Sequence, residues 1–84
     1  MVIINEAVVR REMNERGWGE RQLVGVMDVA ENTVRNVLAG EPLSHSTQVA
    51  LYNAFGGSVP VEELFVVVME NEKHAVHAVQ EAVA

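Results

Sequence analysis

The stretch that decides the fold is residues 17–40, which read GWGERQLVGVMDVAENTVRNVLAG. Its apolar residues include positions 23, 24, 27, 29, 34, 37 and 38. Over about residues 20–27, and again over about 31–38, the apolar residues are spaced as on the buried face of a short helix. Asp28, between the halves, tolerates the left-handed backbone that a tight turn demands. The pattern predicts two short helices locked across this turn, the second of them buried on one side only.

The other side of the second helix is polar, and it carries the candidate functional residues Glu31, Asn32, Arg35 and Asn36. A polar face on a short, half-buried helix is available to a partner. Ala30 stands where a capping side chain is expected, so the start of this helix is weaker than usual.

A first helix is predicted upstream of this pair. Asn5 is a good N-cap, Ile4 and Val9 are placed to form a hydrophobic staple, and Gly17 is a typical C-terminal residue. Trp18, in the connection, is interpreted as a core residue rather than as a ligand-stacking one.

Two more helices are predicted downstream. Ser44 opens a fourth helix, which ends at residues 56–58, and Pro60 is placed as the first residue of a fifth. The apolar positions assigned to the fourth helix are Val49, Ala50, Tyr52 and Phe55. The fold class is therefore all-α, with five helices in a domain over 1–66 and an amphipathic extension over 67–84.

The segment from residue 65 onward leaves alternatives open. A final helix capped by Asn71 is expected, and one long helix from Pro60 is a variant of it. The rival interpretation makes Phe65–Met69 a strand, since its residues are β-branched and aromatic, paired with Val2–Ile4 or with itself across a dimer. Helix is favoured. The apolar face of the final helix is a candidate dimer or partner surface, centred on Val76, Val79 and Val83.

The charge balance is acidic. The chain has a net charge of −6, and residues 1–60 hold five arginines against seven acidic residues. DNA affinity comes largely from Lys and Arg that neutralise phosphates, and DNA-binding domains are usually basic. The net charge of residues 1–60, which contain the two short helices, is thus closer to neutral than that of the rest of the chain, but it is not positive.

Several classes of protein are not supported by the sequence. There is no cysteine for a disulfide or a thiolate metal site, and the longest apolar run, 64–69, is too short to cross a bilayer. The start of the chain lacks the features of a signal peptide, so a cytoplasmic location is expected. His74 and His77 have no convincing third metal ligand, and no nucleophile–base pair or phosphate loop is present. We expect no enzyme, no catalytic residues and no cofactor.

The order of these residues resembles the Xre/Cro/phage-repressor family of helix-turn-helix domains, which are lambda-repressor-like. The resemblance covers about residues 5–65. Beyond the central stretch it continues through residues 54–56 and 59–64, with Gly57 and Ser58 inserted between these two segments. Within the central stretch the family pattern is matched without a gap at Gly17, Trp18, Leu23, Val29, Thr33, Val34, Val37 and Gly40.

The resemblance implies a DNA-binding regulator. It implies that the protein binds double-stranded DNA as a homodimer, with the helix over 31–38 in the major groove. It implies base contacts from Glu31, Asn32, Arg35 and Asn36. Asn bonds an adenine edge in two places, Arg a guanine edge, and Glu accepts from cytosine. It implies phosphate contacts from Glu20, Arg21, Ser44, His45, Ser46 and Thr47.

Departures from the family pattern support a second hypothesis. Glu20 stands where the family often has a phosphate-binding Gln, and a carboxylate there repels DNA. Gly19, Val24, Asp28 and Ala30 also differ from the usual residues. The acidic balance and the apolar tail fit a helix-turn-helix scaffold that binds a partner protein, such as a host factor or a toxin, instead of DNA.

Overall fold

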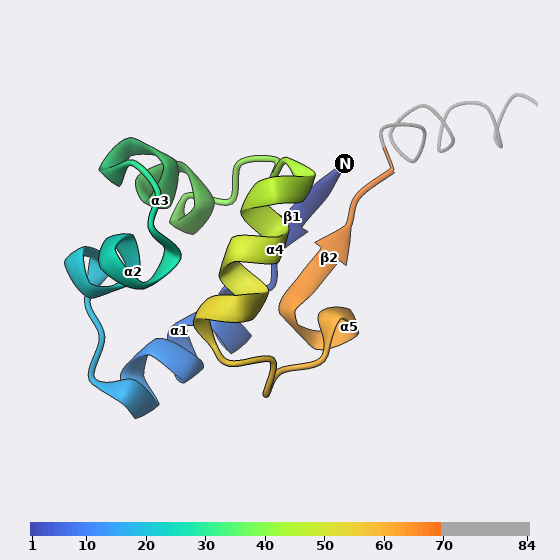
Figure 1. Cartoon of the computed structure of the whole chain (residues 1–84). Helices are drawn as coiled ribbons and strands as arrows, with labels where there is room; N and C mark the ends of the chain where they lie inside the picture. The colour runs from blue at the N-terminus through green and yellow to red at the C-terminus, as the bar shows by residue number, and fades with distance from the viewer. Residues whose placement is uncertain (70–84) are drawn as a thin grey trace, which may run out of the picture.

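The structure is a computed structural model that describes residues 1–69 of the chain. It is mostly helical with a small two-stranded sheet, and α4 (His45–Ala54) lies between that sheet and the pair formed by α2 (Glu20–Met27) and α3 (Glu31–Leu38) (Figure 1). None of the described helices is long and apolar enough to span a membrane. In chain order the elements are β1 (Val2–Ile4), α1 (Glu6–Arg16), α2 (Glu20–Met27), α3 (Glu31–Leu38), α4 (His45–Ala54), α5 (Val61–Leu64) and β2 (Phe65–Val67).

The ends of the first helices follow the predicted caps. The Asn5 side chain accepts a hydrogen bond from the Val8 N–H (3.5 Å), and Gly17 ends α1 with φ 68°. Asp28 ends α2 with φ 56°, in the left-handed region expected for it. Ala30 makes no side-chain cap bond, also as expected.

The start of α2 is capped in a way that the sequence analysis missed. Gly19 has no side chain to offer, but Gln22, three residues into the helix, accepts a hydrogen bond from the Gly19 N–H (2.9 Å). This bond is one half of a capping box. It partly replaces the Ser or Thr cap that Gly19 lacks.

The core joins every element of the described chain. In α4 the fully buried residue is Leu51, one turn before Phe55, whereas Val49 is 43 % exposed. Val49, one of the apolar positions expected for this helix, lies outside the face that meets the core, because that face follows the i, i+4 pair of Leu51 and Phe55. The buried apolar residues are Ile4, Val9, Met13, Leu23, Met27, Val34, Val37, Leu43, Leu51, Phe55, Val59, Leu64 and Phe65.

The helix favoured for Phe65–Met69 is wrong, and so is the single long helix from Pro60. Pro60 precedes α5 as its cap, α5 ends at Leu64, and β2 pairs antiparallel with β1, with Ile4 opposite Phe65 and Val2 opposite Val67. The strand alternative is correct, so the domain is not purely helical. Residues 65–67 become a strand because the N-terminal segment supplies backbone partners: the Asn5 N–H donates to the Leu64 carbonyl (2.9 Å) and the Val68 N–H to the Met1 carbonyl (2.7 Å).

Several predictions fall outside the described residues. These are the helix capped by Asn71, the pair His74 and His77, and the dimer surface of Val76, Val79 and Val83. The boundary predicted between residues 66 and 67 falls inside β2.

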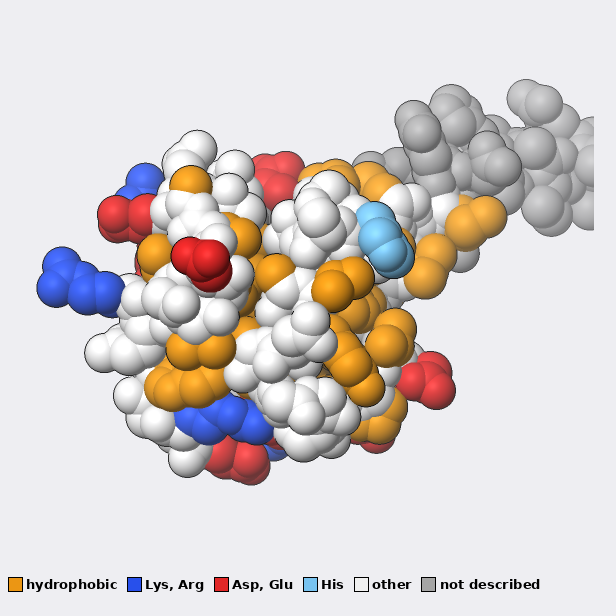
Figure 2. Space-filling view, viewed as in Figure 1, with side chains coloured by type: hydrophobic (Ala, Val, Ile, Leu, Met, Phe, Trp, Pro, Cys, Tyr) orange, Lys and Arg blue, Asp and Glu red, His pale blue; other side chains and the backbone are white. Residues whose placement is uncertain are grey.

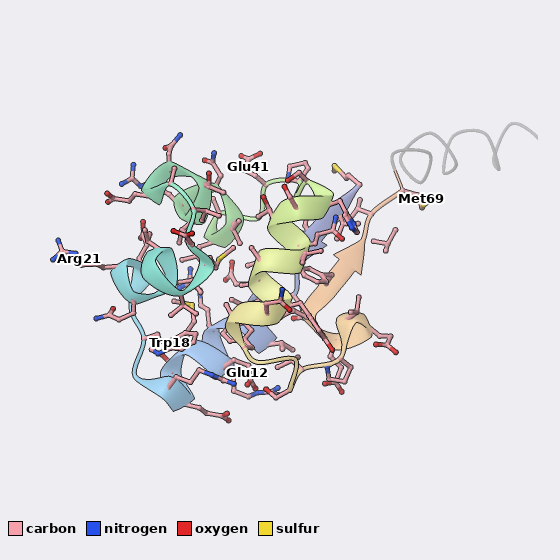
Figure 3. The ribbon with its side chains drawn as sticks, in the orientation of Figure 1. Glu12, Trp18, Arg21, Glu41 and Met69 are labelled. Carbon is pink, nitrogen blue, oxygen red and sulfur yellow. The ribbon has the colours of Figure 1, made fainter. Side chains whose placement is uncertain are left out.

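A charged network ties the end of α1 to the end of α4. Glu12, only 8 % exposed, accepts hydrogen bonds from Arg16 (2.7 Å) and Arg11 (3.1 Å). Arg16 also donates to the Phe55 carbonyl (3.3 Å) and lies over the rings of Phe55 and Trp18 (5.0 and 5.5 Å from their centroids). Glu12 and Trp18 are labelled on this side of the protein in Figure 3. Trp18 stacks on Phe55, as its interpretation as a core residue predicted.

This network makes stability depend on pH. The hydrogen bond from Arg16 outweighs burial and, with Arg11, lowers the pKa of Glu12. Because the folded pKa lies below the unfolded one, the contribution of Glu12 is complete above about pH 4.3 and is lost as the pH falls through the folded pKa. We expect the stability difference between wild type and Glu12→Gln, measured by urea unfolding, to shrink below about pH 4. Glu15→Gln, on the exposed side of α1, is the control, and a difference that stayed constant into acid would contradict the prediction.

Candidate nucleic-acid interface

The exposed side of α3 is built by the packing of its other side. Val34 and Val37 are buried, and α2 ends at the start of the turn with a hydrogen bond from the Asp28 N–H to the Val24 carbonyl (2.9 Å). The four residues predicted from the sequence to face a partner, Glu31, Asn32, Arg35 and Asn36, are all exposed. The prediction of a half-buried helix is confirmed.

These four residues divide into two flanks. Successive helix residues are about 100° apart, so residues four apart lie within about 40° of each other on the helix surface. Glu31 and Arg35 therefore form one side, the charged flank. Asn32 and Asn36 form the other, the amide flank. The two flanks have different neighbours in the fold.

The charged flank is neutralised by carboxylates. The Arg35 Nε lies 3.7 Å from the Glu20 Oε1, and its Nη2 lies 3.3 Å from the Glu31 Oε1. Glu20 comes from the first turn of α2, so this contact crosses from one helix to the other. Arg35 thus lies between two carboxylates, with its side chain 62 % exposed. The sequence analysis treated Glu20 and Arg35 separately and missed this pairing.

The amide flank adjoins the start of α4. Thr33 and Asn36 of α3 line a shallow hollow of about 200 Å³ together with Ser44 and Thr47. Ser44 caps α4 by accepting a hydrogen bond from the Thr47 N–H (3.3 Å), and the two hydroxyls are 2.9 Å apart. Asn36, expected from the resemblance to contact bases, and Ser44 and Thr47, expected from it to contact phosphates, thus line the same hollow.

The remaining predicted phosphate residues are dispersed. His45 lines a separate hollow with Val61 and Phe65, so the structure does not bring it to the amide flank. Ser46 is exposed in the first turn of α4, and its hydroxyl lies 3.2 Å from that of Ser44. Arg21 extends from α2 away from the body of the protein (Figure 3).

The positive charge of the described chain is mostly taken up by ion pairs. Four of its arginines, Arg10, Arg11, Arg16 and Arg35, contact carboxylates at 2.7–3.7 Å. Within residues 1–69, Arg21 is the arginine that makes no such contact. The candidate interface therefore offers amides, hydroxyls and helix N–H groups, but few cations.

Comparisons with protein-family models, with curated proteins and with solved structures found no match for this chain. The resemblance of residues 17–40 to the Xre/Cro pattern therefore remains a prediction.

Proposed function

We propose that the protein is a sequence-specific DNA-binding transcriptional regulator of the Xre/Cro or phage-repressor type. In this proposal α2, the turn and α3 form a helix-turn-helix, and α3 enters the major groove. The observation that carries it is the continuous exposed polar side of α3 beside the N-terminus of α4. The major groove admits an α-helix, and free N–H groups at a helix start bind phosphate. A cytoplasmic, nucleoid-associated location follows from this function.

The division of α3 into flanks refines the proposed roles. Asn32 and Asn36 read bases first, since each is exposed and each amide matches an adenine edge. Arg35 and Glu31 act on bases only after their ion pair opens. Arg21 and the hydroxyls at the start of α4 contact the phosphates of the DNA backbone, and these contacts fix the position of α3 along the duplex.

The direct test is selection of binding sites from random double-stranded DNA at two salt concentrations. We expect a consensus sequence and a shallow salt dependence, with a slope of log K on log salt of about −1 per chain, because Arg21 is the main unpaired cation of the interface. Failure to enrich any sequence at either salt concentration would refute the proposal.

Removing the carboxylate of Glu20 is expected to strengthen DNA binding. Glu20→Gln leaves Arg35 paired with Glu31 alone and removes a charge that repels phosphate. The salt slope should become more negative by up to about 0.9 per chain, the value for one added phosphate contact. Titrations of the selected DNA at several salt concentrations measure this change.

Glu15→Gln is the matched control, because it removes the same charge from the exposed surface of α1. If both variants change affinity equally, only net charge matters and the proposed place of Glu20 at the interface is wrong.

A second function, binding of a partner protein through the same helices, is favoured by one observation. Residues 1–69 carry nine acidic residues against five arginines, four of which are paired. An acidic surface suits a basic partner protein. Binding to such a partner that is lost in Asn36→Ala, in a protein that enriches no DNA, would favour this alternative.

A further inference from the structure

A groove lies between one side of α4 and one face of the small sheet. It is formed by two hollows of about 180 and 690 Å³, which share Gln48, Val61 and Phe65 as lining residues. Its residues on α4 are three or four apart and share one side of the helix, and its residues on β2 are two apart and share one face of the sheet. The apolar lining consists of Val2, Val49, Tyr52, Val61, Phe65 and Val67.

This groove exposes apolar side chains to solvent. Val49, Val61 and Val67 are 43, 52 and 62 % exposed, and Figure 2 shows hydrophobic side chains gathered over α4, α5 and β2. Contiguous exposed apolar surface on a small protein marks an interaction site. We therefore expect an apolar occupant.

The polar side chains of the groove leave this apolar surface available. The Gln48 amide and the Tyr52 hydroxyl donate to the backbone carbonyls of residues 43 and 57 (3.1 and 3.4 Å), so both polar groups are bonded within the domain. His45 lines the smaller hollow, and Glu62 lines the larger one and is the only acidic residue of the lining. An occupant with a large negative charge would be repelled by Glu62.

The chain itself continues from one end of the groove. Val67, a lining residue, lies opposite Val2, whose carbonyl accepts a hydrogen bond from the Leu43 N–H (2.7 Å) just before α4 begins. β2 therefore runs from α5 toward the start of α4. A segment that turned back after Met69 would run along the groove beside α4 and in the same direction as α4.

The sequence that follows Met69 has the pattern and the length for this place. Its apolar residues at 75, 76, 79, 82 and 83 have the i, i+1, i+4, i+7, i+8 spacing of one side of a helix. All five are Ala or Val, which are small enough for a shallow groove. As a helix, residues 73–84 would span about 18 Å, and α4, with 10 residues, spans about 15 Å.

Three considerations favour this segment over a separate molecule as the occupant. A helix of fewer than about 15 residues is marginal in water, so its apolar side needs a surface to pack on. A short tether gives the segment an effective concentration near the groove in the millimolar range. Residues 73–84 hold one lysine and one glutamate, so with neutral histidines they bring no net charge toward Glu62, whereas a second copy of the chain brings −6.

We propose that residues 73–84 form a helix that docks into this groove of their own chain. The side of the helix that carries Val76, Val79 and Val83 packs against the groove between α4 and β2. The same residues were predicted from the sequence to form a dimer or partner surface, and docking makes that surface internal. The inference does not require DNA binding.

Paramagnetic broadening in the full-length chain tests the proposal. The chain contains no cysteine, so Gln80→Cys carries a single nitroxide label beside the apolar side of the proposed helix. We expect the amide signals of Val49, Val61 and Val67 to be lost through broadening. The amide signal of Val26, on α2, should remain.

Substitutions on both sides of the contact check that the apolar packing is responsible. Val79→Asp in the segment and Val49→Asp in the groove should each lower the docking constant by about tenfold or more and restore the lost signals. The matched controls place the same acid elsewhere. His77→Asp lies opposite the apolar side of the proposed helix, and Val26→Asp is at a valine of α2 with 45 % exposure. Both controls should keep the broadening.

A mixture of two chains separates docking within one chain from docking between copies. In it, a nitroxide-labelled chain without isotope enrichment is combined with an isotopically enriched chain without the nitroxide. We expect no broadening of the enriched chain. Broadening of the enriched chain would show that a second copy supplies the segment and would overturn the proposal. A labelled chain without broadening at the groove, or broadening that persists in both Val79→Asp and Val49→Asp, would overturn it as well.

Discussion

Replacing Phe55 with alanine is expected to lower the free energy of unfolding by about 3–5 kcal/mol, the largest effect of any substitution considered for this chain. Phe55 is 2 % exposed, stacks on Trp18 with ring centroids 5.8 Å apart, and lies under the Arg16 guanidinium. The alanine variant loses buried apolar area and the stacking partner, and leaves a cavity where α1 meets α4. In a domain of this size such a loss is a large share of the total stability.

Urea unfolding followed by Trp18 fluorescence and by circular dichroism measures the effect of Phe55→Ala. Trp18 is the only tryptophan, so its emission reports directly on this stack. Val26→Ala, at a valine 45 % exposed in α2, is the control and should change stability by less than about 0.5 kcal/mol. Equal effects of the two substitutions would show that Phe55 is not part of the core.

Replacing Asn36 with alanine is expected to weaken binding to the selected DNA sequence by about 1–3 kcal/mol, or roughly 5- to 150-fold. The Asn36 side chain is exposed and makes no hydrogen bond to another described residue, so its loss costs the fold little. Alanine also has the higher helix propensity. The decrease in DNA affinity should therefore come from base recognition alone. The preference for one base should be relaxed at one position of the site, and weak binding to random DNA should be unchanged.

Titration of the selected sequence and of its single-base variants tests the role of Asn36. Asn53→Ala makes the same chemical change at an exposed position near the end of α4, away from the start of that helix, and should leave binding unchanged. If Asn36→Ala and Asn32→Ala both bind the selected sequence as the wild type does, the amide flank is not the reading surface.

The approximate bounds predicted for α2 and α3 agree with the structure because the signals for these helices are local. An apolar spacing of three and four residues, a residue that tolerates positive φ at Asp28, and glycines at each end depend on neighbours within one or two turns. The exposure of Asn32, Arg35 and Asn36 followed from the same periodicity, since the buried side of α3 leaves one side to solvent.

Contacts between distant segments were harder to predict. The sequence offered helix and strand for Phe65–Met69, and pairing with Val2–Ile4, more than sixty residues away, decided for strand in Phe65–Val67. Similarly, nothing in the spacing of Glu20 and Arg35 showed that they come within 3.7 Å across two helices. That contact changes the expected role of Arg35, from a residue ready to bind guanine to one held by carboxylates.

The sequence by itself determined the helical pair, its turn and the polar side of α3, because hydrophobic periodicity and backbone preference act within a few residues. The tertiary structure decided that Arg35 on that side is paired with Glu20, and that Phe65–Val67 forms a strand beside Val2–Ile4. Both depend on segments brought together only when the core closes, and local propensity contains no information about that approach.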